Sequence, residues 1–185
     1  MKIKLFCFGV LGFLILGSCK DDALPKPKSY LKLEYPNSAY LPLNSACPFS
    51  FEIAEQASIS IKPNCWSTIS YPKLKATIHL TYREIDQNLN EILAEVEKMT
   101  FEHTVKADAI EVIPYENFNH QVFGKLYEVK GNVATNLQFS VTDSTRHVLS
   151  GALYFYVKPN YDSILPAIKY IEKDIRHLIE TLEWK

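Results

Sequence analysis

The sequence predicts a single α+β domain in which an antiparallel sheet is covered by two long helices. Apolar and polar residues alternate in several short runs, which is the period of a half-buried strand. Two longer runs, starting near Asp86 and Asp162, repeat apolar residues every three or four positions, as amphipathic helices do. The runs after Ala109 are joined by turns too short for crossover connections, so we expect antiparallel pairing.

The N-terminus has the pattern of a lipoprotein signal. Lys2 and Lys4 precede a short apolar stretch that cannot span a bilayer as a helix, because a span needs about 20 apolar residues. The stretch ends in Leu16-Gly17-Ser18-Cys19, which resembles the bacterial lipobox. We therefore expect a signal peptide over 1–18 and lipid on Cys19, the alternative being an ordinary secretory signal with a chance cysteine.

After the lipid, residues 19–29 are expected to form a tether and residues 30–185 a single domain. Pro25 and Pro27 favour an extended spacer. Lys20-Asp21-Asp22 resembles the charged signal that sends some Bacteroidetes lipoproteins to the cell surface, and a solvated tether explains the same residues equally well.

The elements of the domain follow from periodicity, in chain order. Alternation predicts strand structure over 49–61 and, most clearly, over 75–82. A helix follows, capped at Asp86 or Asn88 and running to about Val105. The remaining predicted elements are strands over 109–114, 122–129, 137–141 and 149–157, a hairpin loop over 142–146, and a C-terminal helix from Asp162 or Ser163. By analogy, an α/β/α sandwich of the MOG1/PsbP type would accommodate this order.

Two cysteines remain in the domain, Cys47 and Cys65. In an exported protein they suit a disulfide, which would close a loop of about 17 residues and stabilise the fold by about 3 kcal/mol. Two buried free thiols are the alternative. No CxxC or HxxxH spacing lies near either cysteine, so we expect no metal there.

The sequence carries no recognised catalytic signature. Asp143, Ser144 and His147 suggest a triad, but Ser144 lies in no GxSxG motif, and such residues are common in hairpin loops. The histidines have no metal-ligand spacing, and there is no GxGxxG or P-loop. We therefore expect no catalytic residue, metal or cofactor. Loss of the two signal lysines moves the net charge from −1 to −3, which gives no basic footprint for nucleic acid.

The aromatic residues can be interpreted either as a binding face or as part of the core. Tyr154, Phe155 and Tyr156 stand together near the end of a predicted strand, and some of them could form a binding face. Trp66 and Trp184 are expected first to close the core between sheet and helix.

Short distinctive segments occur in a fixed order along the mature chain. They are Cys47-Pro48-Phe49, Cys65-Trp66, Ile78 to Tyr82, His103 with Lys106-Ala107, Gly131 to Ala134, Gln138-Phe139, Thr142 to Ser144, Gly151 to Phe155, Pro159 to Ile164 and Ile179 to Trp184. In order and spacing these segments resemble the gliding-motility lipoprotein GldD family of Bacteroidetes, from Pro25 to the end of the chain.

The resemblance implies a role in gliding motility and in its partner apparatus, the type IX secretion system. It predicts a non-enzymatic assembly or stability factor whose partners are other gliding and secretion envelope proteins. With lipid on Cys19, we expect an outer-membrane protein that faces either the periplasm or the medium. The loop of Thr142, Asp143 and Ser144 is a candidate partner contact, which turn chemistry explains equally well. The alternatives are a lipoprotein that binds glycan or peptide, and a hydrolase using His147 or His103 with Asp143 and Ser144.

Overall fold

The computed structural model describes residues 35–37, 39–102, 107–157 and 160–185. The predicted signal peptide, tether and lipidated Cys19 lie outside these residues. The described strands are β1 (Tyr40–Pro42), β2 (Phe49–Ser50), β3 (Glu52–Ala54), β4 (Ser58–Ile61), β5 (Ser67–Tyr71), β6 (Ala76–Glu84), β7 (Ala109–Asn117), β8 (Val122–Lys130), β9 (Thr135–Thr142), β10 (His147–Phe155) and β11 (Glu183–Trp184). The described helices are η1 (Pro72–Leu74), a 3-10 turn, and the α-helices α2 (Leu89–Glu102) and α3 (Tyr161–Glu180).

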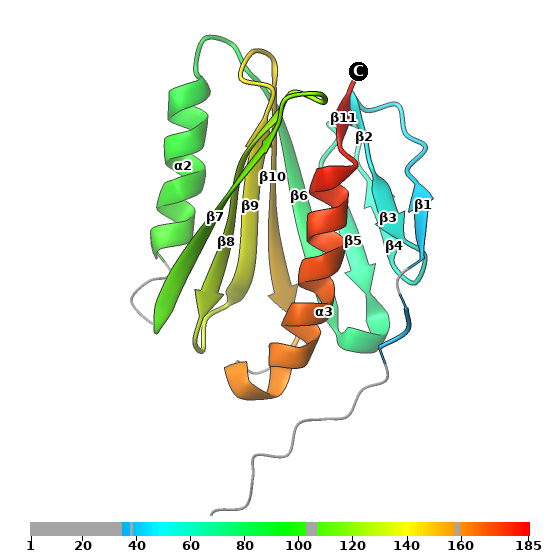
Figure 1. Cartoon of the computed structure of the whole chain (residues 1–185), viewed down its shortest axis with the longest axis vertical. Helices are drawn as coiled ribbons and strands as arrows, with labels where there is room; N and C mark the ends of the chain where they lie inside the picture. The colour runs from blue at the N-terminus through cyan, green and yellow to red at the C-terminus, as the bar shows by residue number, and fades with distance from the viewer. Residues whose placement is uncertain (1–34, 38, 103–106, 158–159) are drawn as a thin grey trace, which may run out of the picture.

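Seven of the described strands form one antiparallel sheet in the order β4-β5-β6-β10-β9-β8-β7 (Figure 1). β10 lies in the middle, paired with β6 along its whole length and with β9 on its other side. The small pairs β1–β3 and β2–β11 stand beside this sheet. β11 is the C-terminal strand, so its pairing with β2 joins the last residues of the chain to a segment near the start of the domain.

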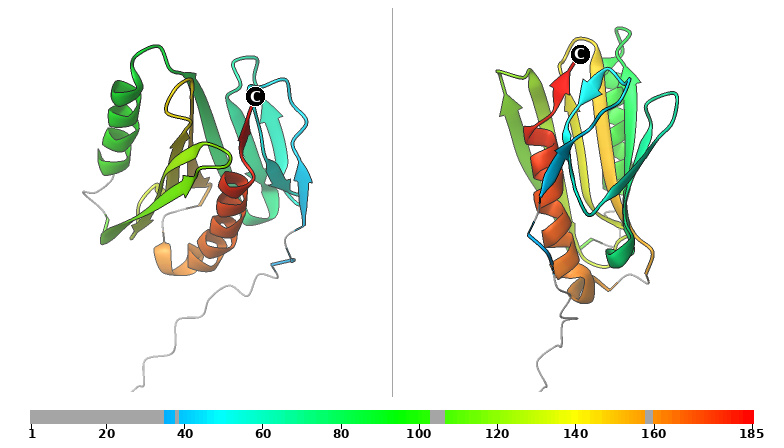
Figure 2. Two further views of the ribbon diagram at one scale, coloured as in Figure 1. Left: turned by 45° about the horizontal axis from the view of Figure 1, so that its top comes forward. Right: turned by 90° about the vertical axis from the view of Figure 1, so that its right-hand side faces the viewer.

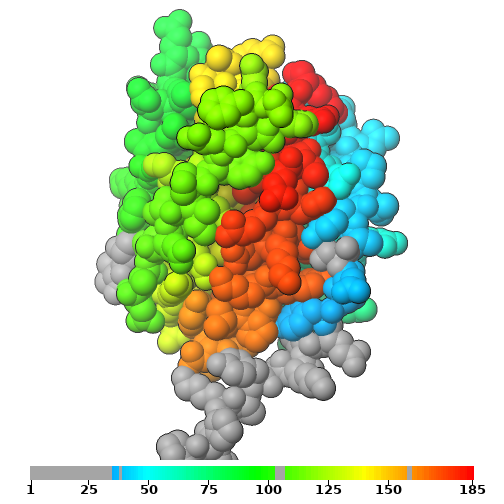
Figure 3. All heavy atoms as spheres, viewed as in Figure 1, coloured from blue at the N-terminus to red at the C-terminus, as the bar shows by residue number. Residues whose placement is uncertain are grey.

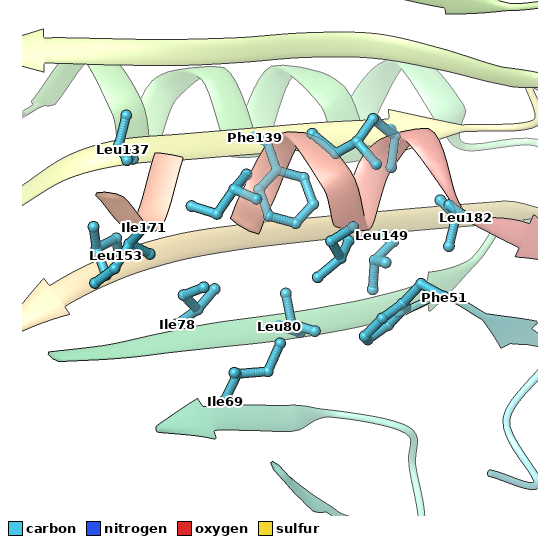
Figure 4. Packing of buried hydrophobic residues seen from close by; sticks show 14 of the residues in the cluster. Phe51, Ile69, Ile78, Leu80, Leu137, Phe139, Leu149, Leu153, Ile171 and Leu182 are labelled. Atoms are coloured by element: carbon cyan, nitrogen blue, oxygen red, sulfur yellow. The ribbon is translucent and has the colours of Figure 1, made fainter. Parts of the chain in front are cut away.

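The core lies on one face of the sheet. Alternation on β6 places Ile78 and Leu80 on this face, and both side chains are fully buried. α3 lays its apolar stripe against them, with Ile168, Ile171 and Ile175 at 0% exposure. Figure 4 shows Phe139 between α3 and β10. Removing apolar surface from water stabilises a fold by about 25 cal/mol per Å², so this contact contributes to the stability of the domain.

Buried polar bonds fix α3 against the N-terminal strands. Asp174, which is 4% exposed, accepts hydrogen bonds from the hydroxyls of Tyr40 (2.9 Å) and Tyr71 (3.1 Å). Burial, reinforced by the Asp174 carboxylate, raises the pKa of Tyr71, so its hydroxyl stays a donor. The two tyrosines thereby tie β1 and β5 to one carboxylate on the helix.

The predicted fold class is wrong. Of the described residues, 44% are in strands and 26% in helices, so the domain is mostly β rather than an α/β/α sandwich with two long covering helices. The core face is covered by α3 together with the N-terminal strands, and Figure 3 shows α3 filling the space between β7 and those strands. α2 has 14 residues, of which Ile92 and Thr100 are buried, and Figure 2 shows the strands standing between it and α3.

Several local predictions are also corrected. The strand-like stretch over 49–61 is broken into β2, β3 and β4, and each belongs to a different sheet. β1, β5 and β11 were not predicted. β1 and β11 have three and two residues, which is too short for alternation to be recognised.

We expect Gly151→Ala to destabilise the domain by about 1–3 kcal/mol through overpacking. A Cβ at this position would lie 2.3 Å from Cε1 of Phe139, whose ring is held between β10 and α3. Urea unfolding measures the cost. In a Phe139→Leu background the added cost of Gly151→Ala should be smaller, because the ring that the methyl group meets is gone. An equal cost in both backgrounds would contradict the contact.

Candidate functional site

The face of the sheet opposite the core carries polar side chains, and α2 covers only part of it. α2 lies over β8 and β9. Its Glu97 receives Lys125 Nζ at 2.7 Å and the Tyr127 hydroxyl at 3.1 Å, both from β8. Thr100 Oγ1 lies 3.2 Å from Gln138 Oε1 on β9. The same face of β5, β6 and β10 lies beyond the helix.

A hollow of about 180 Å³, here named the β10 groove, lies between α2 and β6. Its floor is β10, where Ser150 and Ala152 are too small to fill the space beside the helix. Ala152 is paired with His79 on one side and with Gln138 on the other, so the groove is one strand wide. The lining residues are His79, Thr81, Arg83, Glu95, Val96, Met99, Gln138, Phe139, Ser150, Gly151, Ala152 and Tyr154.

The walls of the β10 groove are mostly apolar. Val96 and Met99 project from α2, and Met99 is 56% exposed. On the other side, His79 and Tyr154 meet edge to face with ring centroids 5.5 Å apart. Arg83 of β6 reaches to Glu95 of α2 at 2.6 Å. This ion pair is solvent-exposed, so it closes one end of the groove without stabilising the fold greatly.

Gln138 supplies a buried polar group to the groove. The residue is 7% exposed, and its Oε1 faces Thr100. Its Nε2 has no hydrogen-bond partner among the described residues. A buried amide donor without an acceptor costs free energy, and the great majority of such groups in proteins are paired. Gln138 therefore brings an unpaired buried donor to the lining of the groove.

A second hollow, of about 270 Å³, lies between the start of the described domain and α3. Two of its three tyrosine hydroxyls are engaged: Tyr71 donates to Asp174, and Tyr170 donates to the Pro36 carbonyl at 3.1 Å. The rings of Tyr35 and Tyr170 are in contact, with centroids 4.9 Å apart. This hollow lies where the start of the described domain packs against α3, and it offers a ligand fewer free polar groups than its size suggests.

The predicted partner-contact loop of Thr142, Asp143 and Ser144 connects β9 to β10. Thr142 and Asp143 are buried, and Ser144 is exposed with a positive φ of 65°. Asp143 Oδ1 accepts the backbone N–H groups of Thr145, Arg146 and His147 at 2.8–2.9 Å. Burial alone would raise the pKa of Asp143, but these hydrogen bonds lower it overall. Asp143 therefore acts within the turn, and Ser144 is the member of the set that can reach a partner.

The structure does not assemble a triad from Asp143, Ser144 and His147. His147 is 6% exposed, and its Nδ1 lies 2.8 Å from the Tyr82 hydroxyl, while its ring stacks on Trp184. Its Nε2 has no partner in the described part of the chain, so no hydrogen bond joins it to Ser144. Burial lowers the pKa of His147 and so favours the neutral ring, although the nearby Asp143 carboxylate acts in the opposite direction. His103 lies outside the described residues.

The other histidines make separate local contacts. His177 on α3 lies 2.7 Å from Glu52 and stacks on Tyr40, and His120 lies 3.7 Å from Glu183. Over the described ranges, no group of three or more histidine, cysteine or acidic side chains is arranged to hold a metal ion.

Cys47 and Cys65 lie together at one end of the domain. Their sulfur atoms are within bonding distance, and their Cα atoms are 5.7 Å apart, as disulfide geometry requires. Cys47 is 4% exposed. The pair would link the segment before β2 to the turn between β4 and β5, and β2 belongs to a different sheet from β4 and β5.

Sequence reasoning missed the β10 groove because its residues come from α2, β6, β9 and β10. One local signal was available: Ser150-Gly151-Ala152 is a run of small residues inside a strand, which marks a place where something approaches closely. Trp66 was predicted to close the core but is 45% exposed, with its Nε1 donating to the Tyr82 carbonyl. Trp184 does pack against the core cluster.

A family model described as gliding motility lipoprotein GldD matches residues 20–184. No curated protein matches the chain.

We expect Cys47 and Cys65 to be bonded in the exported protein. In a mature chain carrying Cys19→Ala they are the two remaining cysteines, so without reductant neither should react with an alkylating agent. Adding reductant should expose both thiols and lower the free energy of unfolding by about 3 kcal/mol. Alkylation of both without reductant would identify them as free thiols instead.

We expect Asp143→Asn to destabilise the domain by about 1–2 kcal/mol at pH 7, because it removes the charge that holds three backbone N–H groups. The folded pKa of Asp143 is lowered, so its stabilising effect is present above the unfolded value of about 3.9 and is lost as pH falls through the folded value. Urea unfolding from pH 7 to pH 3 should therefore show wild type and variant converging at the acid end. Ser144→Ala is the matched control, and a gap that stays constant with pH would refute the role given to the charge.

Proposed function

The chain belongs to the gliding motility lipoprotein GldD family, and from this membership we propose that it is a non-enzymatic assembly or stability factor of the gliding apparatus and its partner type IX secretion system. The observation that carries the proposal is the extent of the match, which runs from the residue after Cys19 almost to the C-terminus. The family is a motility lipoprotein family and is not a known enzyme family.

Family membership makes the protein a lipid-anchored component of the cell envelope. We place the lipid on Cys19 and the anchor in the outer membrane. Two or more acyl chains hold a protein stably, whereas one short chain holds it weakly. Within the part of the chain that the structure describes, no helix is long and apolar enough to cross a bilayer.

The domain is suited to presenting a rigid surface to other envelope proteins. In Figure 1 the β9–β10 loop and the C-terminus lie at one end of the sheet, and the described part of the chain begins at the other end. Ser144 in this loop therefore lies far from the end of the domain that follows the lipid. We propose the exposed side of the loop as one partner contact and the β10 groove as another.

The second candidate function is a lipoprotein that binds a small ligand, either a glycan or a peptide. The β10 groove favours it, because it combines apolar walls with a buried polar group. Its volume of about 180 Å³ is below the 300–1,000 Å³ that is usual for drug-sized ligands. The groove therefore suits one anchoring group of a larger partner better than an isolated ligand.

Deletion of the gene in its host should abolish colony spreading and reduce secreted cargo, and the wild-type gene should restore both. Cys19→Ala should fail to restore them, because the domain would lose its lipid and its place in the envelope. An immunoblot of cell fractions checks that the variant is made at the normal level. Normal spreading and secretion in the deletion strain would overturn the proposed function.

A further inference from the structure

We propose that the β10 groove binds an extended, apolar peptide segment of a partner protein. One apolar side chain of the segment packs between Val96, Met99 and Ala152, and its backbone bonds to the Gln138 amide. The inference rests on the proposed function for the choice of a protein partner, and on the geometry of the groove for everything else.

Gln138 is the first reason. Its amide lies at the wall of a solvent-accessible hollow, is more than nine-tenths buried, and presents an N–H group with no acceptor among the described residues. Thr100 Oγ1 lies 3.2 Å from Gln138 Oε1 and 3.0 Å from the Val96 carbonyl, so one hydroxyl proton serves two acceptors. A peptide backbone offers both a donor and an acceptor at each residue, so it matches a side-chain amide in either of its two orientations.

The shape of the groove is the second reason. Ser150, Ala152 and Tyr154 alternate along β10 on the groove face, so the hollow follows the direction of the strand. The Arg83–Glu95 ion pair closes one end. A volume of about 180 Å³ accommodates one large apolar side chain, as a hot-spot pocket at an interface does. An extended segment lying along β10 would place such a side chain in the hollow and its backbone beside Gln138.

The walls are the third reason. Met99 is a large apolar side chain that lines the hollow and is 56% exposed. Methionine is flexible and polarisable, and it adapts to apolar groups of different shape. Sugar hydroxyls would require several free donors and acceptors. Arg83 and Glu95 pair with each other, and His79 Nδ1 lies 3.4 Å from Thr68 Oγ1, so these three polar side chains are already engaged. These contacts favour a peptide over a glycan.

The test uses the mature chain with Cys19→Ala, selected against a phage-displayed library of random heptapeptides. Fluorescence polarisation then measures the Kd of the selected peptides for each variant. Gln138→Leu removes the amide at similar size and should weaken binding about tenfold. Ala152→Leu fills the hollow and should weaken binding by at least as much. Ser70→Leu enlarges a side chain on the same face of β5, outside the groove, and should change Kd less than twofold.

Stability measurements keep these outcomes interpretable. Gln138→Leu replaces an unpaired buried donor by an apolar group, so its urea midpoint should equal or exceed that of wild type. Should Ala152→Leu fail to fold, Met99→Ala serves instead, because it trims an exposed side chain of the same wall.

Two results would overturn the inference. One is a selection that yields no peptide, or yields peptides that bind wild type and groove variants alike. The other is a glycan array in which sugars bind wild type and lose binding in the same groove variants. Both measurements are made on purified protein, so they can fail while the deletion phenotype stands. A normal deletion strain, conversely, would refute the motility role and leave the groove intact.

Discussion

The pairing register of β10 is the constraint on which the rest of the structure depends. β10 is bonded to β6 along nine positions and to β9 on its other edge. In this register Leu149, Gly151 and Leu153 face the core, while Ser150, Ala152 and Tyr154 face the groove. A slip of one residue would exchange the two sets and place Ser150 against α3. One ladder of backbone hydrogen bonds therefore fixes the core and the candidate site together.

The two faces of the sheet meet different demands, and β10 meets both with small residues. On the core face, Gly151 has no Cβ, which lets the Phe139 ring lie against the strand. On the other face, Ser150 and Ala152 leave space that α2 does not fill, since the helix is held over β8 and β9 by Glu97 and Thr100. The groove thus results both from the position at which α2 is hydrogen-bonded to the sheet and from the small side chains of β10.

Much of the local structure could be predicted from the sequence, because period-2 and period-3.6 patterns are local. β6, β8, β9, β10 and the two α-helices were all predicted near their observed positions. The arrangement of the layers could not be predicted, since it depends on how far α2 reaches and on two-residue strands, β2 and β11, that pair across more than a hundred positions. The proximity of Cys47 and Cys65 agrees with the predicted pair. The location of the candidate site could not be predicted for the same reason as the layers. Asp143 was singled out because of its neighbours in sequence, whereas the groove at Gln138 is formed by residues that are neighbours only in space.

The buried polar side chains of β9 differ in whether they hydrogen-bond within the domain. Asn136 Nδ2 donates to the carbonyls of Val129 (2.8 Å) and Gly131 (3.1 Å), and Thr142 Oγ1 donates to the His147 carbonyl at 2.6 Å. These two residues hold the turns at either end of the strand. Gln138, also buried, lies between them in the strand and lines the β10 groove, yet its amide closes no turn and its Nε2 has no acceptor among the described residues. Two residues of this strand thus have their side-chain donors satisfied internally, and Gln138 is left with the donor that the backbone of the proposed peptide would satisfy.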